Sequence, residues 1–243
     1  MILYDDGGNP LKDMLTQNSY SFTCPAMTPQ NFNIICKHLN NPPDVPDIDG
    51  TEYGKPGVKY TFYVEVVDPD EDSIYCMWDW GDGSYSAWLG PFGSGEVISA
   101  SHVWSYGFYN IRVKAKDILG AESNWSDPLT LIIEDEPPMV EITKPEKALY
   151  LRNRKILPRF FRKTLILGSI DITVDAVDDF SGIDRVEFYI DNDLKSFDNS
   201  SPYIYIWTKD KITLFRHRHT IKVVAFDNAG NSVSDEIKVR KFL

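Results

Sequence analysis

The sequence has no apolar run that approaches the roughly 20 residues needed to span a bilayer as a helix. No window repeats apolar residues at the helical spacing of about 3.6 residues, so we expect very little helix. The first residues include Asp5 and Asp6 and contain no apolar core segment, so they do not have the features of a signal peptide. We therefore expect no transmembrane segment and no leader in this chain.

Basic residues and cysteines are also scarce. The chain has 25 Lys and Arg against 36 Asp and Glu, a formal net charge of −11. A nucleic-acid-binding protein needs a basic face for the phosphates, so we expect no nucleic-acid partner, whereas an acidic surface attracts cations. The three cysteines indicate no disulfide framework: Cys76 is expected to be a small buried thiol, and whether Cys24 and Cys36 pair depends on the compartment.

The motifs of the common enzyme classes are missing as well. The sequence contains no Gly-x-Ser-x-Gly elbow, phosphate-binding loop, His-Glu-x-x-His element or Cys-His pair in a suitable context. Carboxylates are abundant, but acids at the turns of a β-sandwich are more often structural than general acids or bases. We therefore expect no catalytic residues and a protein that is not an enzyme.

The most informative stretch is the run Trp78-Asp79-Trp80-Gly81-Asp82-Gly83. The Gly-Asp-Gly part supplies the positive φ angles and side-chain hydrogen bonds of a tight turn. Large apolar side chains precede it with a period of two, which places them on one face of a strand. Such a load is usually buried between two packed sheets, so the pattern predicts a β-sandwich. The residues on that face are Ile74, Cys76, Trp78 and Trp80.

This run and the sequence after it resemble the PKD (polycystic kidney disease) domain, an immunoglobulin-like (Ig-like) β-sandwich. The pattern of that family is Trp-Asp-aromatic-Gly-Asp-Gly, then His-x-aromatic, Gly-x-Tyr and Asp-x-x-Gly. The resemblance covers roughly residues 43–134, and it implies structural roles for its motif residues. These residues are Trp78, Asp79, Gly81, Asp82, Gly83, His102, Trp104, Gly107, Tyr109, Val113, Asp117 and Gly120.

An internal repeat predicts a second sandwich. Residues 111–120, IRVKAKDILG, match residues 221–230, IKVVAFDNAG, at an offset of 110. The same offset places residues 62–68 on 172–178, and Trp78 on Phe188. Because a slip of one residue turns every side chain to the other face, shared parity in three strands indicates one architecture used twice.

The second half of the chain resembles the prokaryotic Ig-like domains of surface proteins, mainly through residues 182–191, Trp207 and residues 227–231. We thus predict an all-β chain with two tandem Ig-like β-sandwiches. Its parts are an unassigned segment at residues 1–43, a PKD-like sandwich at 44–136 and an Ig-like sandwich at 137–243.

Residues 147–163 of the second unit form a basic stretch with no acid. One interpretation is a basic loop lying against the acidic body of the protein; the other is a contact with an anionic polymer or a partner domain. The cations are Arg152, Arg154, Lys155, Arg159 and Arg162.

Acidic residues are predicted to meet at the junction of the two units. In an Ig-like fold, the loop after the second strand and the loop before the last strand lie at the N-terminal end of the domain. That end of the second unit faces the linker acids, and the turn with Asp82 approaches it from the first unit. Converging oxygen ligands suit Ca²⁺, the one cofactor that we consider; solvated turn residues are the alternative. The candidate ligands are Asp178, Asp179, Asp227, Asp135 and Glu136, with Asn228 and Glu134 beside them.

The resemblance implies an extracellular or cell-surface location, and an exported protein would make this chain a fragment without its leader. We expect a spacer and interaction (adhesion) region of a larger protein, contacting adjacent domains of that protein and other surface proteins or polysaccharide. The alternative is a carbohydrate-binding accessory of a secreted hydrolase. Exposed aromatic residues along one sheet face would favour that alternative, whereas buried tryptophans favour the spacer.

Overall fold

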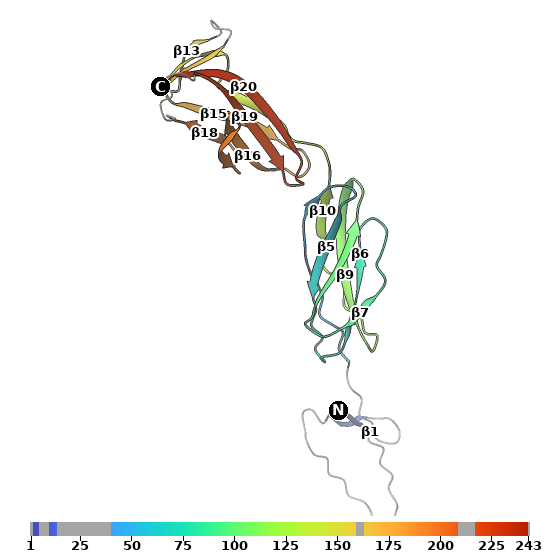
Figure 1. Ribbon diagram of the computed structural model, residues 1–243. Coiled ribbons are helices and arrows are strands. Elements are labelled where there is room, and N and C mark those ends of the chain that lie inside the picture. The colour runs from blue at the N-terminus through green and yellow to red at the C-terminus, as the bar shows by residue number, and fades with distance from the viewer. Residues whose placement is uncertain (1, 5–9, 14–39, 159–162, 209–216, 243) are drawn as a thin grey trace, which may run out of the picture.

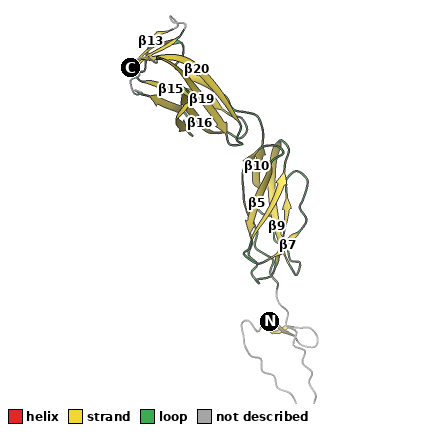
Figure 2. Ribbon diagram, viewed as in Figure 1, coloured by secondary structure: helices red, strands yellow, loops and turns green. Residues whose placement is uncertain are grey.

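The computed structural model describes residues 2–4, 10–13, 40–158, 163–208 and 217–242. The elements in these ranges are all strands (Figure 2), which confirms the predicted all-β class. No helix in this part of the chain is long and apolar enough to cross a membrane. Strands β1 (Ile2–Tyr4) and β2 (Pro10–Asp13) form a small antiparallel sheet of their own. Cys24 and Cys36 lie outside the described residues.

The first sandwich is built from two sheets. One sheet has the order β4-β10-β9-β6-β7 and the other β3-β5-β8. Their pairs are antiparallel except for β4 and β10, which run parallel. The strands are β3 (Asp47–Asp49), β4 (Tyr53–Gly54), β5 (Lys59–Glu65), β6 (Ile74–Asp79), β7 (Leu89–Phe92), β8 (Val97–Val103), β9 (Gly107–Asp117) and β10 (Leu129–Ile133).

The tryptophan-rich face of β6 forms the core of this sandwich, as its period predicts. Trp78 is fully buried, and its ring stacks on that of Trp80 with the centroids 5.4 Å apart. Cys76 is a buried free thiol, and burial raises its pKa to about 12, so it stays protonated and packs as an apolar group. The strand therefore contributes apolar side chains to the space between the sheets, and its other face points outward.

The second sandwich also has two sheets. Their orders are β11-β15-β18 and β13-β12-β14-β20-β19-β16-β17. The core between them includes the buried rings of Phe188 and Trp207. The strands are β11 (Met139–Lys144), β12 (Ala148–Leu151), β13 (Arg154–Pro158), β14 (Thr164–Leu167), β15 (Ile170–Val177), β16 (Ile183–Ile190), β17 (Asp193–Asp198), β18 (Tyr203–Trp207), β19 (Arg218–Asp227) and β20 (Ser232–Phe242).

The strand registers confirm the internal repeat. In the first sandwich Trp78 of β6 lies opposite Val113 of β9. In the second, Phe188 of β16 lies opposite Val223 of β19, which is the same pair moved by 110 residues. The offset therefore relates two copies of one sheet core, and it also relates the loops that follow these strands.

The two sandwiches lie end to end and give the molecule an elongated shape (Figure 1). The chain passes from β10 to β11 through residues 134–138, so the acidic linker lies where the second sandwich meets the first. The sequence-based boundaries at residues 43 and 136 stay predictions, although β3 to β10 and β11 to β20 fall on either side of the linker.

Candidate functional site at the junction of the two sandwiches

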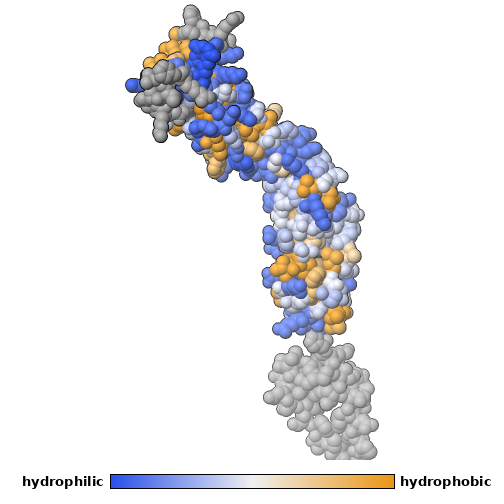
Figure 3. Space-filling model, in the orientation of Figure 1, coloured by the Kyte–Doolittle hydropathy of each residue, from blue (hydrophilic) through white to orange (hydrophobic). Residues whose placement is uncertain are grey.

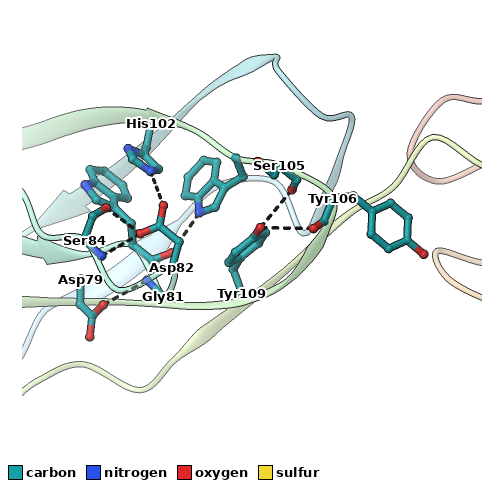
Figure 4. A network of polar contacts seen from close by, with 10 residues as sticks. Asp79, Gly81, Asp82, Ser84, His102, Ser105, Tyr106 and Tyr109 are labelled. Atoms are coloured by element: carbon teal, nitrogen blue, oxygen red, sulfur yellow. Dashed lines mark hydrogen bonds and ion pairs between the residues drawn. The ribbon is translucent and has the colours of Figure 1, made fainter.

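The turn after β6 is held by a network of side chains (Figure 4). Asp82 Oδ2 lies 2.8 Å from His102 Nε2, and Asp82 Oδ1 accepts hydrogen bonds from Ser84. Burial raises the pKa of Asp82, but the hydrogen bonds from Ser84 and His102 outweigh it and hold this pKa below its ordinary value. Gly81 has φ of +74°, and a Cβ there would lie 2.7 Å from the Asn110 nitrogen. These contacts hold the turn in its conformation, while the structural role of the whole motif stays a prediction.

Three carboxylates gather where the linker meets the second sandwich. Glu134 lies in the linker directly after β10, Asp178 in the loop between β15 and β16, and Asp227 at the end of β19. One oxygen of each lies within 4.8 Å of an oxygen of the other two. Glu134 and Asp227 are 1% and 2% exposed. We call these three residues the junction triad.

Backbone and side-chain donors fix the orientation of the triad. Asp178 Oδ1 accepts hydrogen bonds from the backbone nitrogens of residues 180, 181 and 182 at 3.1, 2.8 and 2.8 Å. Glu134 accepts from the Ser181 hydroxyl at 2.8 Å and from Asn231 Nδ2 at 3.1 Å. Asp227 Oδ1 accepts from the Asn231 nitrogen at 2.7 Å. Asp227 Oδ2 is buried and has no hydrogen-bond partner.

The triad brings negative charge together at a buried place. Burial and then the negative charges of Asp227 and Asp178 raise the pKa of Glu134, partly offset by the Ser181 hydrogen bond. Within the described ranges, no Lys, Arg or His forms an ion pair with any of the three carboxylates. The donor set consists of oxygens alone and includes a buried oxygen without a partner, which fits a hard divalent cation such as Ca²⁺.

The predicted ligands divide into two groups. Asp178 and Asp227 belong to the triad, while Asp179, Asp135 and Glu136 are exposed. Asn228 Nδ2 donates to the Ser181 carbonyl and supports the loop. Whether any of these residues binds a metal stays a prediction.

The acid that completes the triad is Glu134, which the sequence does not distinguish from its neighbours. Its backbone nitrogen donates to the Gly54 carbonyl at 3.0 Å, which continues the β4–β10 pairing and turns the side chain toward the second sandwich. A sequence pattern gives no sign of this pairing, because β4 has only two residues.

Further contacts join the two sandwiches around the triad. Lys55 Nζ donates to the Gly230 carbonyl at 2.7 Å. The Phe180 ring meets Tyr106 edge to face with the centroids 5.9 Å apart, and it lies 6.4 Å from the Phe108 ring. The loops that carry Asp178 and Asp227 therefore contact the first sandwich directly.

Comparison with known proteins identifies both units. The first is similar to the PKD domain of an M14-like peptidase from a Thermoplasmatales archaeon, with 39% identity over 100% of that chain and 40% of this one, at a TM-score of 0.38. The chain belongs to the PKD-domain family. The family profile described as bacterial Ig domain matches residues 162–223, within the second unit. The resemblances seen in the sequence are thus confirmed for the PKD domain and the Ig-like domain.

Two other solved structures are similar to this chain, and the first of them shares its fold. The fibronectin(III)-like modules of CbhA from Clostridium thermocellum are 21% identical, cover 81% of this chain and 95% of theirs, and have a TM-score of 0.50. The PKD domain of the human receptor SorCS2 is 20% identical, covers 48% of this chain and 94% of its own, and has a TM-score of 0.28. The search of curated proteins gives no match. PKD and bacterial Ig domains typically occur in extracellular proteins, and domains of these families are generally non-catalytic.

The basic stretch of the Ig-like domain is partly described. Arg152 and Asn153 form the turn between β12 and β13, and Lys155 forms an ion pair with Glu146. Arg159 and Arg162 lie outside the described residues. A cavity of about 380 Å³ lies beside this region, and its lining is mostly basic. Its lining residues are Lys163, Asp191, Arg218, His219, Thr220, Lys238, Val239 and Arg240. Both interpretations of the stretch stay open.

Tryptophan burial bears on the choice between a spacer and a carbohydrate-binding module. Four of the six tryptophans, at positions 78, 80, 104 and 207, are buried. Trp88 and Trp125 are half-buried on the outer face of the PKD domain, where lysine ammonium groups lie over their rings. On the face seen in Figure 3, apolar residues form separate patches among hydrophilic ones.

Proposed function

We propose that this chain is a spacer and interaction region of a larger extracellular or cell-surface protein, in which Ca²⁺ at the junction triad fixes the two domains relative to each other. The observation that carries the proposal is Glu134, which belongs to both domains. Its backbone extends the β4–β10 pairing of the PKD domain, and its side chain is buried against Ser181 and Asn231 of the Ig-like domain.

A cation at this place has a mechanical effect. Without it, three close carboxylates repel one another across the domain boundary, which favours separation of the linker acid from the two Ig-like loops. With it, the same oxygens become ligands of one ion, and both domains are tied to that ion. The end-to-end arrangement in Figure 1 then becomes one stiff rod, which is what a spacer needs.

The test measures the distance between the domains. Spin labels on cysteines introduced at the exposed positions Ser99 and Lys195, with Cys24 and Cys36 changed to Ser, report the distance distribution by pulsed electron resonance. We expect a narrow distribution with Ca²⁺ and a broader one with chelator. In Glu134→Ala the distribution should be broad in both conditions.

The matched control is Glu136→Ala, because this exposed neighbour carries the same charge but its carboxylate is not one of the triad, and the substitution keeps its backbone hydrogen bond to Glu134. It should behave like the parent. If the distance distribution of the parent protein is equally wide with Ca²⁺ and with chelator, Ca²⁺ does not stiffen the junction.

A second candidate function, carbohydrate binding, is favoured by one observation. Lys116 Nζ lies 4.2 Å from the Trp88 ring centroid, and Lys114 Nζ lies 5.2 Å from that of Trp125, so two half-buried rings line one outer face. Sugars stack on such rings, but here the ammonium groups must first move aside. Retardation in polysaccharide gels that is lost in Trp88→Ala and Trp125→Ala would support this function; migration unchanged by polysaccharide would exclude it for the polymers tested.

A further inference from the structure

We propose that the cavity between β19 and β20 of the Ig-like domain is a binding site for a sulfate or phosphate group carried on a hydrophilic molecule such as a sugar. The guanidinium groups of Arg218 and Arg240 bind the anion, and the ammonium groups of Lys163 and Lys238 complete the site. We call these four residues the basic cluster. The proposal depends neither on Ca²⁺ nor on the spacer role.

The basic cluster lies far from the junction triad. Strand β19 has ten residues, begins at Arg218 and ends at the triad residue Asp227. At about 3.3 Å per residue, the two ends of this strand are about 30 Å apart. Figure 1 shows the C-terminal end of β20, which carries Arg240, at the end of the molecule that is remote from the PKD domain. The two sites therefore share no residue and can be tested separately.

The strand register brings like charges together. In the antiparallel pairing of β19 with β20, Arg218 lies directly opposite Arg240, and Thr220 lies opposite Lys238. Val239 belongs to the core, so its neighbours Lys238 and Arg240 lie on the outer face of the sheet, because side chains alternate along a strand. Side chains directly opposite each other have Cβ atoms about 4.5–5.5 Å apart, and like charges so placed are destabilising. An anion between the two arginines would remove this cost.

No acid of the described chain neutralises the basic cluster. Within the ranges that the structure describes, none of its four residues forms an ion pair. The chain has 36 Asp and Glu against 25 Lys and Arg, so acids are in excess over possible partners. Four cations that line one cavity without a carboxylate partner therefore indicate that the counter-charge comes from a ligand.

The acids near the cavity are directed elsewhere. Asp191 belongs to the lining, but its Oδ2 lies 2.7 Å from His219 Nδ1, and its Oδ1 accepts a hydrogen bond from the Thr220 nitrogen at 2.9 Å. Glu236, two residues before Lys238, lies opposite Lys222 on β19. The cavity thus keeps an excess of positive charge.

The shape and lining of the cavity define the ligand. A guanidinium group is a planar fork that donates two hydrogen bonds to one sulfate or phosphate group, and two such forks suit a group with more than one charged oxygen. The volume of about 380 Å³ falls within the range of small-molecule sites, so there is room for the anion and part of its carrier. Among the described residues that line the cavity there is no Phe, Tyr or Trp, which favours a hydrophilic carrier over an aromatic one.

The test is calorimetric titration of the full chain with glucose 6-sulfate, with inorganic sulfate and with glucose. Sodium chloride keeps the ionic strength equal in all titrations, so that screening does not differ. We expect one molecule of glucose 6-sulfate per chain, weaker binding of inorganic sulfate and no binding of glucose. Arg218→Gln and Arg240→Gln should each weaken the binding of glucose 6-sulfate at least about tenfold, because each removes charged hydrogen bonds to the anion.

Lys222→Gln is the matched control. It removes one positive charge from the same face of β19, but Lys222 is outside the lining and lies opposite Glu236. This variant should bind glucose 6-sulfate like the wild type. Equal weakening in Lys222→Gln and Arg218→Gln would overturn the site, since it would show attraction to the overall charge of the face. A wild type that binds neither sulfate compound would overturn it as well. Inorganic sulfate that binds as tightly as glucose 6-sulfate would overturn the carrier.

Thermal melts distinguish loss of the site from loss of the fold. In chloride alone, Arg218→Gln should melt at a higher temperature than the wild type, because the substitution removes the repulsion with Arg240. Glucose 6-sulfate should raise the melting temperature of the wild type and leave that of Arg218→Gln unchanged. An equal rise in both proteins would contradict the assignment of the anion to this pair of arginines.

Discussion

Changing Asp227 to Asn should raise the stability of the chelated protein and abolish its response to Ca²⁺ at the triad. Asp227 lies within 4.8 Å of two other carboxylates. At an effective dielectric constant of about 20, each of these repulsions costs ~3.5 kcal/mol before hydrogen bonds offset it. The Asn side chain keeps the acceptor for the Asn231 nitrogen and places an NH₂ group where Oδ2 has no partner, so it donates to the neighbouring carboxylates.

We expect a net gain of about 2 kcal/mol for this variant in chelator, because hydrogen bonds already offset most of the repulsion. For a sandwich of this size that corresponds to a melting temperature about 8–16 °C higher. Wild-type protein should instead gain ~2.7 kcal/mol from Ca²⁺ at a hundredfold excess over its dissociation constant. The variant should gain nothing in the transition of the Ig-like domain.

Differential scanning calorimetry in chelator and in Ca²⁺ measures both effects. The transition of the PKD domain is the internal control, since Asp227 lies outside that domain. If Asp227→Asn melts at a lower temperature than the wild type in chelator, the repulsion argument is wrong. If the variant keeps the wild-type response of the Ig-like domain to Ca²⁺, the triad does not hold the ion.

Three further predictions follow from single contacts. The pKa of Glu134 is raised above its ordinary value of 4.5, so near this pH the folded chain in chelator binds more protons than the unfolded chain. The contribution of Glu134 to stability should therefore fall as the pH rises from about 4.5. Urea unfolding of the wild type and of Glu134→Gln across this pH range measures the difference, and equal pH profiles would contradict the raised pKa. Trp104→Phe should lower the free energy of unfolding by about 1 kcal/mol more than Trp78→Phe, because Trp104 Nε1 donates to the Trp80 carbonyl at 3.0 Å while Trp78 Nε1 has no partner. Equal losses of stability in urea unfolding would show that this hydrogen bond contributes nothing. Phe180→Ala should broaden the spin-label distance distribution and cost about 1–3 kcal/mol through the loss of its two ring contacts. An unchanged distribution would show that these ring contacts do not hold the domains in place.

The fold was predictable from the sequence because its signals are local and repeated. The period of two before the Gly-Asp-Gly turn determines which face of β6 is buried, and the offset of 110 residues carries the same parity into β16. Both signals depend on strand geometry alone, so they survive without knowledge of the tertiary contacts.

The candidate sites were only partly predictable. Asp178 and Asp227 follow from Ig-like topology, because loop position decides at which end they lie. The choice of Glu134 over Asp135 depends on a backbone hydrogen bond to Gly54, a contact that no pattern encodes.

The parallel pairing of β4 with β10 has a consequence for a protein that is pulled from its two ends. These two strands lie close to the start and to the end of the PKD domain and run in the same direction. Tension applied at residue 40 and at the linker therefore pulls these two strands past each other and loads their hydrogen bonds together, in shear, rather than breaking them one after another. One of these bonds runs from the Ile132 nitrogen to the Glu52 carbonyl at 2.8 Å. In the Ig-like domain the last strand, β20, also has a parallel partner, β14, over a longer register, although β11 to β13 precede β14 in the chain. We therefore expect the β4–β10 pair to resist extension of the PKD domain along the long axis of the molecule.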